Sequence, residues 1–158
     1  ALRNRWRRLR VPHHLRVGWW SLFGFGAAGL VLEALHGFKV PAYLDATNDA
    51  RRLAWTLAHT HGTLLGVAHV LFAVSLRAFP DLAAAQRATV SRALVWSTVL
   101  LPGGFLLGGI FVYGGDPGLG ILIVPFGALS FLLAALVLAR ASSRVAERPD
   151  AARGKERR

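Results

Sequence analysis

Four long apolar stretches constrain this chain more than any other feature of its sequence. They cover residues 17–38, 54–76, 93–113 and 119–139, and a helix needs roughly 20 apolar residues to cross a bilayer core. Backbone groups in lipid must bind one another, so such stretches form helices or the strands of a closed barrel. These stretches lack the alternation of apolar and polar residues that a barrel strand shows, and they are about twice as long as such a strand. We therefore expect an all-α, integral membrane four-helix bundle.

The placement of basic residues predicts how this bundle sits in the membrane. Six of the 19 Lys and Arg residues lie in 1–16, three in 77–92 and seven in 140–158, which leaves only three for the opposite side. Basic loops stay on the cytoplasmic side. We expect a multi-pass protein of the bacterial cytoplasmic (inner) membrane, with both termini cytoplasmic. Its parts are a basic segment (1–16), a membrane domain (17–140) and a basic tail (141–158), whose charges attract anionic lipid headgroups rather than nucleic acid.

Missing residue types exclude several kinds of chemistry. The chain has no cysteine and no methionine. Disulfides, iron–sulfur clusters, thiolate zinc sites, haem attached through cysteines and a methionine haem ligand are therefore excluded. No pattern of hydrolytic or nucleophilic residues is visible either. We expect no catalytic activity from the chain on its own.

Small residues on the first two stretches predict close helix packing. Residues 24–29 match the G-x-G-x-x-G pattern, but no strand precedes them, so they indicate a helix contact and not a nucleotide site. The second stretch carries a ladder of small residues at every fourth position: Ala54, Ala58, Gly62 and Gly66. The third and fourth stretches contain Pro102 and Pro125. These prolines predict a kink in the third helix and an interruption of the fourth.

Ionisable residues inside the apolar stretches are the candidate functional residues. Glu33 and His36 come late in the first stretch, and His59 and His61 come early in the second. Each costs about 2.5–3.5 kcal/mol in hydrocarbon, which calls for a function or a partner. Histidines on facing helices can hold haem. We expect haem b between the first two helices, ligated by His36 with His59 or His61.

Glu33 would tune the charge of that site or relay protons, and Gly62 would let the ring approach the helix. The open alternative is that these polar residues only join helices by hydrogen bonds. The deeper His69 is expected to make such a helix–helix bond. His13 and His14 precede the first stretch and are expected to be solvated.

The segment Trp55–Gly66, with sequence WTLAHTHGTLLG, resembles the second helix of the catalytic subunits of haem-copper oxidases and nitric oxide reductases. The resemblance implies that His61 is an axial haem ligand and that Gly62 is the close-approach position. It covers about a dozen residues, and those subunits have about twelve helices, so it implies neither oxidase activity nor a copper centre. Over its whole length, the chain loosely resembles small four-span bacterial membrane proteins of unknown function.

Two functions follow as hypotheses. The first is a haem b-binding or respiratory-chain-associated protein with a role in electron transfer. The second is a non-catalytic structural or assembly subunit without a cofactor, whose glycine faces bind partner helices in a homo-oligomer or a larger membrane complex. A third hypothesis is a small proton- or solute-conducting protein that uses Glu33 and His69.

Overall fold

The computed structural model describes residues 2–45, 49–78 and 82–146, and for 2–10, 77–78 and 144–146 it describes the backbone alone. In this part of the chain the fold is all-helical and without strands. Its elements are α1 (Leu2–Gly37), α2 (Ala50–Ala78), α3 (Ala84–Ile110), the short 3₁₀ helix η1 (Leu119–Ile123) and α4 (Val124–Ala146). Most of the predicted tail, from residue 147 onward, lies outside the described residues.

Four helical segments are long and apolar enough to cross a membrane, as expected. They are Val11–Gly37, Ala50–Leu76, Ala84–Ile110 and Leu119–Ser143. The first three begin four to nine residues before the predicted stretches, because polar and basic residues at the ends of α1, α2 and α3 are also helical. The orientation of these spans in a bilayer stays a prediction.

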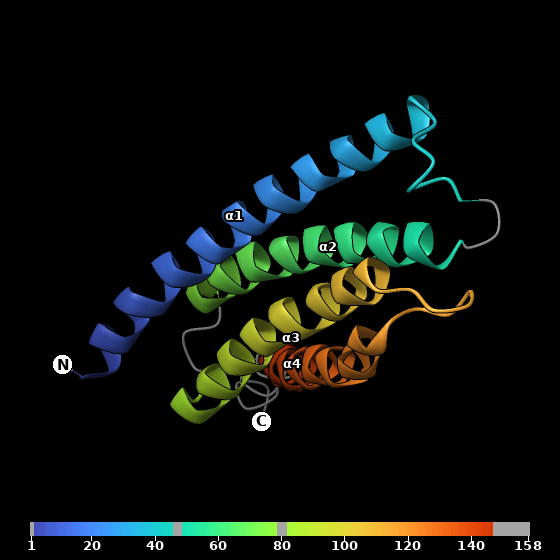
Figure 1. The fold of residues 1–158 in the computed structure, drawn as a ribbon. Helices are drawn as coiled ribbons and strands as arrows, with labels where there is room; N and C mark the ends of the chain where they lie inside the picture. The colour runs from blue at the N-terminus through green and yellow to red at the C-terminus, as the bar shows by residue number, and fades with distance from the viewer. Residues whose placement is uncertain (1, 46–48, 79–81, 147–158) are drawn as a thin grey trace, which may run out of the picture.

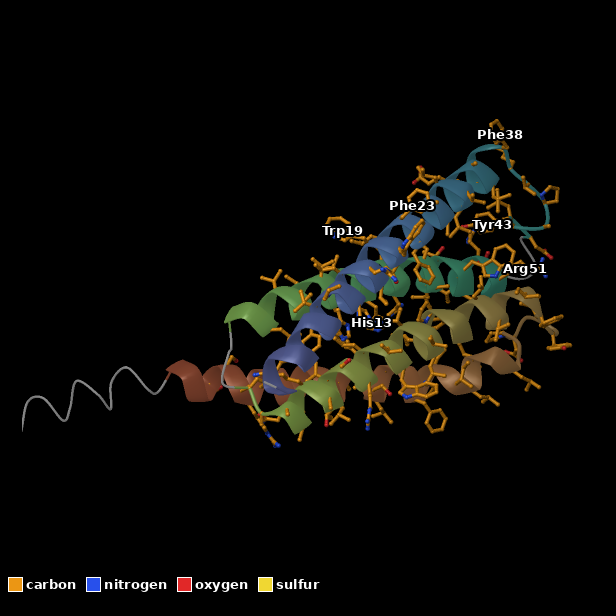
Figure 2. All side chains as sticks on the ribbon, turned by 90° about the vertical axis from the view of Figure 1, so that its left-hand side faces the viewer. His13, Trp19, Phe23, Phe38, Tyr43 and Arg51 are labelled. Atoms are coloured by element: carbon orange, nitrogen blue, oxygen red, sulfur yellow. The ribbon has the colours of Figure 1, made fainter. Side chains whose placement is uncertain are left out.

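The helices pack in chain order: α1 on α2, α2 on α3, and α3 on α4 (Figure 1). Within the described residues α1 makes little contact with α3 and none with α4. One flank of α1 is therefore left uncovered by the other described helices. Aromatic side chains on α1, among them Trp19 and Phe23, project away from the other helices (Figure 2).

Small residues allow α1 and α2 to approach closely. Gly18 lies against Gly66 and Val70, the ring of Phe25 lies on Gly62, and the ring of His59 lies on Gly29. A Cβ atom at Gly62 would overlap the Phe25 ring. Gly62 and Gly66 of α2 thus lie at the predicted helix contact. Of the glycines in 24–29, only Gly29 belongs to it, because Gly24 and Gly26 face open space.

The last two helices form an antiparallel hairpin. Tyr113 and Asp116 exchange two backbone hydrogen bonds of 3.0 and 2.8 Å, and the two residues between them, Gly114 and Gly115, have φ of +53° and +97°. Glycine adopts this left-handed conformation without steric cost. α3 continues through Pro102. Pro125 does not interrupt a helix, because it is the second residue of α4, where its missing N–H has no helical partner to lose.

A hydrophobic core joins the ends of the helices nearest the termini. Its buried members come from α2, the segment before α3, α3 and α4: Phe72, Leu76, Leu82, Val90, Ala93, Leu94 and Ala134. At the opposite end, side chains of α2 bind backbone carbonyls near the end of α3. Arg51 donates to Gly109 O over 3.0 Å, and the indole of Trp55 donates to Leu106 O over 3.3 Å. The site described next lies beside the core.

Candidate functional site

A buried chain of hydrogen bonds connects α1, α2 and α3. The Nδ1 atoms of His14 and His69 are 2.6 Å apart. His14 Nε2 lies 2.8 Å from Ser91 Oγ, and His69 Nε2 lies 3.0 Å from Thr98 Oγ1. Both histidines have no exposed surface. Buried polar groups are costly unless they are hydrogen-bonded, and here all four ring nitrogens have a partner.

The direction of these bonds follows from one hydroxyl. Thr98 donates its only hydroxyl hydrogen to Leu94 O over 2.9 Å, so its oxygen accepts from His69 Nε2–H. A neutral His69 then accepts at Nδ1 from His14 Nδ1–H. His14 in turn accepts at Nε2 from the hydroxyl of Ser91. All the bonds therefore point the same way, from Ser91 to Leu94, when both imidazoles are neutral.

The burial of His14 corrects an expectation. The sequence placed His13 and His14 outside the spans and solvated, but α1 continues through them and only His13 is exposed. His14 lies one turn before Gly18, on the helix face that contacts α2. That spacing was the available signal, and it was missed. The expected helix–helix bond of His69 is confirmed by its bonds to His14 and Thr98.

The predicted haem ligands on α2 point to different neighbours. His59 Nδ1 lies 2.5 Å from Phe25 O of α1. His61 Nδ1 lies 2.8 Å from Leu57 O of its own helix, and its ring stacks on Phe105 of α3. A carbonyl can only accept, so Nδ1 carries the proton in both rings and Nε2 is the nitrogen left with a lone pair. A backbone carbonyl that accepts from Nδ1–H is also the usual support of a metal-ligating histidine.

The other predicted ligands lie apart from this pair. His36 is exposed near the end of α1 and lines a separate cavity of about 460 Å³ together with Tyr43 and Arg52. Glu33 is exposed and makes no hydrogen bond or ion pair with a described residue. Gly62 is covered by Phe25. In the described part of the chain, no group of three or more His, Asp or Glu could hold a metal ion.

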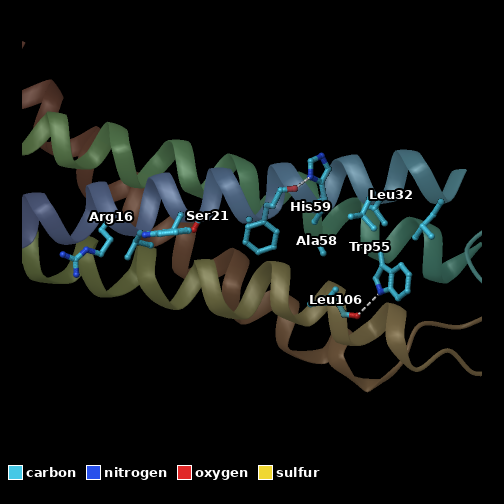
Figure 3. A pocket seen from close by; sticks show the side chains of 14 residues that line it. Arg16, Ser21, Leu32, Trp55, Ala58, His59 and Leu106 are labelled. Carbon is cyan, nitrogen blue, oxygen red and sulfur yellow. Dashed lines mark hydrogen bonds between the residues drawn. The ribbon is translucent and has the colours of Figure 1, made fainter. Parts of the chain in front are cut away.

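A groove of about 810 Å³ opens beside α1 (Figure 3). Its α1 lining runs from Arg16 to Leu35, which is about 28 Å of helix, close to the thickness of a bilayer core. α2 contributes Trp55, Ala58 and His59. Arg16 is the charged residue of the lining and lies at one end of the groove. The rest of the lining is almost entirely apolar: Val17, Trp20, Ser21, Gly24, Phe25, Ala28, Val31, Leu32 and, from α3, Leu106.

Comparison with family models, with curated proteins and with solved structures finds no match to this chain in any of the three. The function must therefore be argued from the residues themselves. The arrangement offers two separate features: a lipophilic groove that one histidine lines, and a buried two-histidine chain nearer the basic end of the helices.

Proposed function

We propose that this chain is a small integral membrane protein that binds haem b in the groove beside α1, with a role in electron transfer. One observation carries the proposal: His59 lines the groove, and its Nδ1–H is held by Phe25 O at 2.5 Å, which leaves Nε2 as the ligating nitrogen. Ligand pockets typically measure about 300–1,000 Å³ and are mostly apolar with few polar groups. The groove has both properties.

The proposal selects among the residues suggested by the sequence. The slot expected between α1 and α2 is filled by the rings of Phe25 and His59, so the groove beside α1 is the location with room for haem. The His59 ring lies against Gly29 and would have to turn toward the groove to bind the iron. His61 and His36 do not line it. Haem would supply one-electron redox chemistry when bound, and the chain would supply one axial ligand. Trp20 and Trp55 would cover part of the ring, and Arg16 would attract carboxylates on the ligand.

The test is a reduced-minus-oxidised visible spectrum of the detergent-purified protein after haem addition. We expect a haem b spectrum with the properties of a single-histidine site, including binding of carbon monoxide. His59→Ala should abolish it, and His61→Ala should retain it. A loss confined to His61→Ala would move the ligand to the residue that the resemblance implies. A flat spectrum from folded protein would contradict haem binding.

A second function, a structural subunit without a cofactor, is favoured by a different observation. A Cβ atom added at Gly24 or Gly26 of α1, or at Gly103 of α3, would meet no neighbouring helix within 4 Å. Small residues on exposed faces of membrane helices allow a second helix to approach closely. A second copy of the chain or a larger membrane complex would then cover α1.

The oligomeric state in detergent, measured by light scattering, tests this function. Gly26→Leu should reduce the mass of the assembly to that of a monomer. Ala27→Leu adds the same kind of bulk about 100° around the same helix and should leave the mass unchanged. A monomer in the unaltered protein would contradict the packing role.

A further inference from the structure

We propose that the His14–His69 pair is a proton-binding site that takes up a single proton from the end of the helices near the N-terminus and carries its charge toward the middle of the membrane. This inference is independent of haem binding. It rests on the continuous path Ser91–His14–His69–Thr98, whose three contacts measure 2.8, 2.6 and 3.0 Å.

The pair can accept one proton without losing a hydrogen bond. In the neutral chain His14 Nε2 is an acceptor, so an incoming proton binds there and the Ser91 hydroxyl turns to accept instead of donating. The proton on His14 Nδ1 can then move across the 2.6 Å gap to His69 Nδ1. His69 becomes an imidazolium that still donates from Nε2 to Thr98, and His14 returns to neutral. One proton has entered, and no other bond has changed.

A second proton is excluded by the same geometry. With both rings protonated, two N–H groups would face each other across 2.6 Å, and two like charges would share one buried site. The two imidazoles must therefore titrate as one unit. The site is a one-proton site, although it contains two histidines.

The surroundings give the path one open end. Exposed His13 lies beside His14, with ring centroids 5.2 Å apart. Ser91 is about 10 Å along α3 from Ala84, and Thr98 is about 21 Å along it, near its middle. Beyond Thr98 toward the other end, the buried residues Leu65, Leu101 and Pro102 are apolar. A proton that enters beside His13 thus reaches the membrane interior and returns the same way.

Among the side chains that the structure describes, few other charges face the pair. On α3, the buried Arg87 lies one turn before Ser91. On α1, the neighbours are His13 and the exposed Arg16. On α2, the ring of Phe72 packs edge-on against His14. The other described titratable groups of α2 are all two turns or more from His69: Arg51, Arg52, His59 and His61. α4 contributes no titratable group to the core beside the pair.

Nitrogen NMR of the full chain in lipid nanodiscs, labelled with ¹⁵N-histidine, tests the proposal. At high pH we expect opposite tautomers, with the proton on Nδ1 of His14 and on Nε2 of His69. As the pH falls, the signals of both rings should move together with one midpoint and a total uptake of one proton. His14→Gln should remove the coupled step, and His36→Gln, on an exposed residue at the far end of α1, should leave it unchanged.

A second variant keeps the test decisive if His14→Gln does not fold. Ser91→Ala removes the hydroxyl that binds His14 Nε2 and leaves the contact between the two rings, so both signals should still move together with one midpoint and a total uptake of one proton. Separate midpoints, an uptake of two protons, or two neutral rings down to the pH of unfolding would each overturn the proposal.

Discussion

At the scale of single residues, the α1–α2 contact depends on glycines, because these residues have no side chain to keep the helices apart. A Cβ at Gly62 would overlap Phe25, whereas a Cβ at Gly24 would meet nothing within 4 Å. We expect Gly62→Ala to lower the free energy of unfolding by about 1–3 kcal/mol, the usual cost of overpacking. Gly24→Ala is the matched control and should be neutral or slightly stabilising, since alanine is the better helix former. Thermal or denaturant unfolding in detergent measures both changes, and equal effects would contradict the contact.

A buried hydroxyl on α3 gives a prediction of the opposite sign. Ser97 has no exposed surface, and its Oγ has no hydrogen-bond partner among the described residues. An unsatisfied buried polar group costs about 1–3 kcal/mol. Ser97→Ala should therefore raise the free energy of unfolding, by about 1 kcal/mol. Ser91→Ala is the control: it removes a hydroxyl that binds His14 and should lower the free energy of unfolding. A loss of stability in Ser97→Ala would show that the Ser97 hydroxyl has a hydrogen-bond partner.

At the scale of elements, side chains near the start of α2 donate hydrogen bonds to backbone carbonyls near the end of α3 and so hold these two helix ends together. Arg51 donates to Gly109 O over 3.0 Å and to Ala42 O over 2.8 Å. The last four carbonyls of a helix have no partner within it, so this guanidinium stabilises the end of α3 and the loop after α1 together. Arg51→Gln should lower the free energy of unfolding by about 1–2 kcal/mol, with the faster hydrogen exchange confined to residues near 42 and 106–111. Arg52→Gln is the control, because Arg52 pairs only with the nearby Asp49, within one turn. Uniform loss of protection along α3 would contradict a local fastening.

The sequence predicted the elements well and their polar contacts less well. The length of the apolar stretches alone located the four spans, because a helix satisfies all of its own backbone hydrogen bonds in lipid. The small-residue ladder of α2 located the contact with α1. The partner of His69 could not be found from the sequence, because it depends on how far α1 extends toward the N-terminus and on the rotation of α3. His14, Ser91 and Thr98 are separated by up to 84 positions and meet only through that packing. From the sequence, Arg51 enters only as one of the basic residues that predict membrane orientation, and its hydrogen bonds to Gly109 and Ala42 depend on the packing of α2 on α3.

At the scale of the whole molecule, packing in chain order explains why the groove exists. α1 rests on α2 and is not covered by α4 (Figure 1). The groove beside α1 therefore stays open along most of the length of that helix. Arg16 and His59 both line this groove. The His14–His69 pair lies instead at the closed contact of three helices. The lipophilic groove and the proton path are thus separate features, which is why their tests can fail independently.

The side from which a proton reaches His14 depends on the orientation of the whole chain, and the absence of cysteine makes that orientation measurable. Single cysteines replace Ala42, Ala85 and Ser143, exposed residues in the loop after α1, at the start of α3 and near the end of α4. Because basic loops stay in the cytoplasm, a membrane-impermeant maleimide should label Ala42→Cys in intact cells. It should label Ala85→Cys and Ser143→Cys only after the membrane is opened. The reverse pattern would place the proton site at the outer face. Labelling of Ala42→Cys and Ala85→Cys from the same side would contradict a membrane crossing by α2.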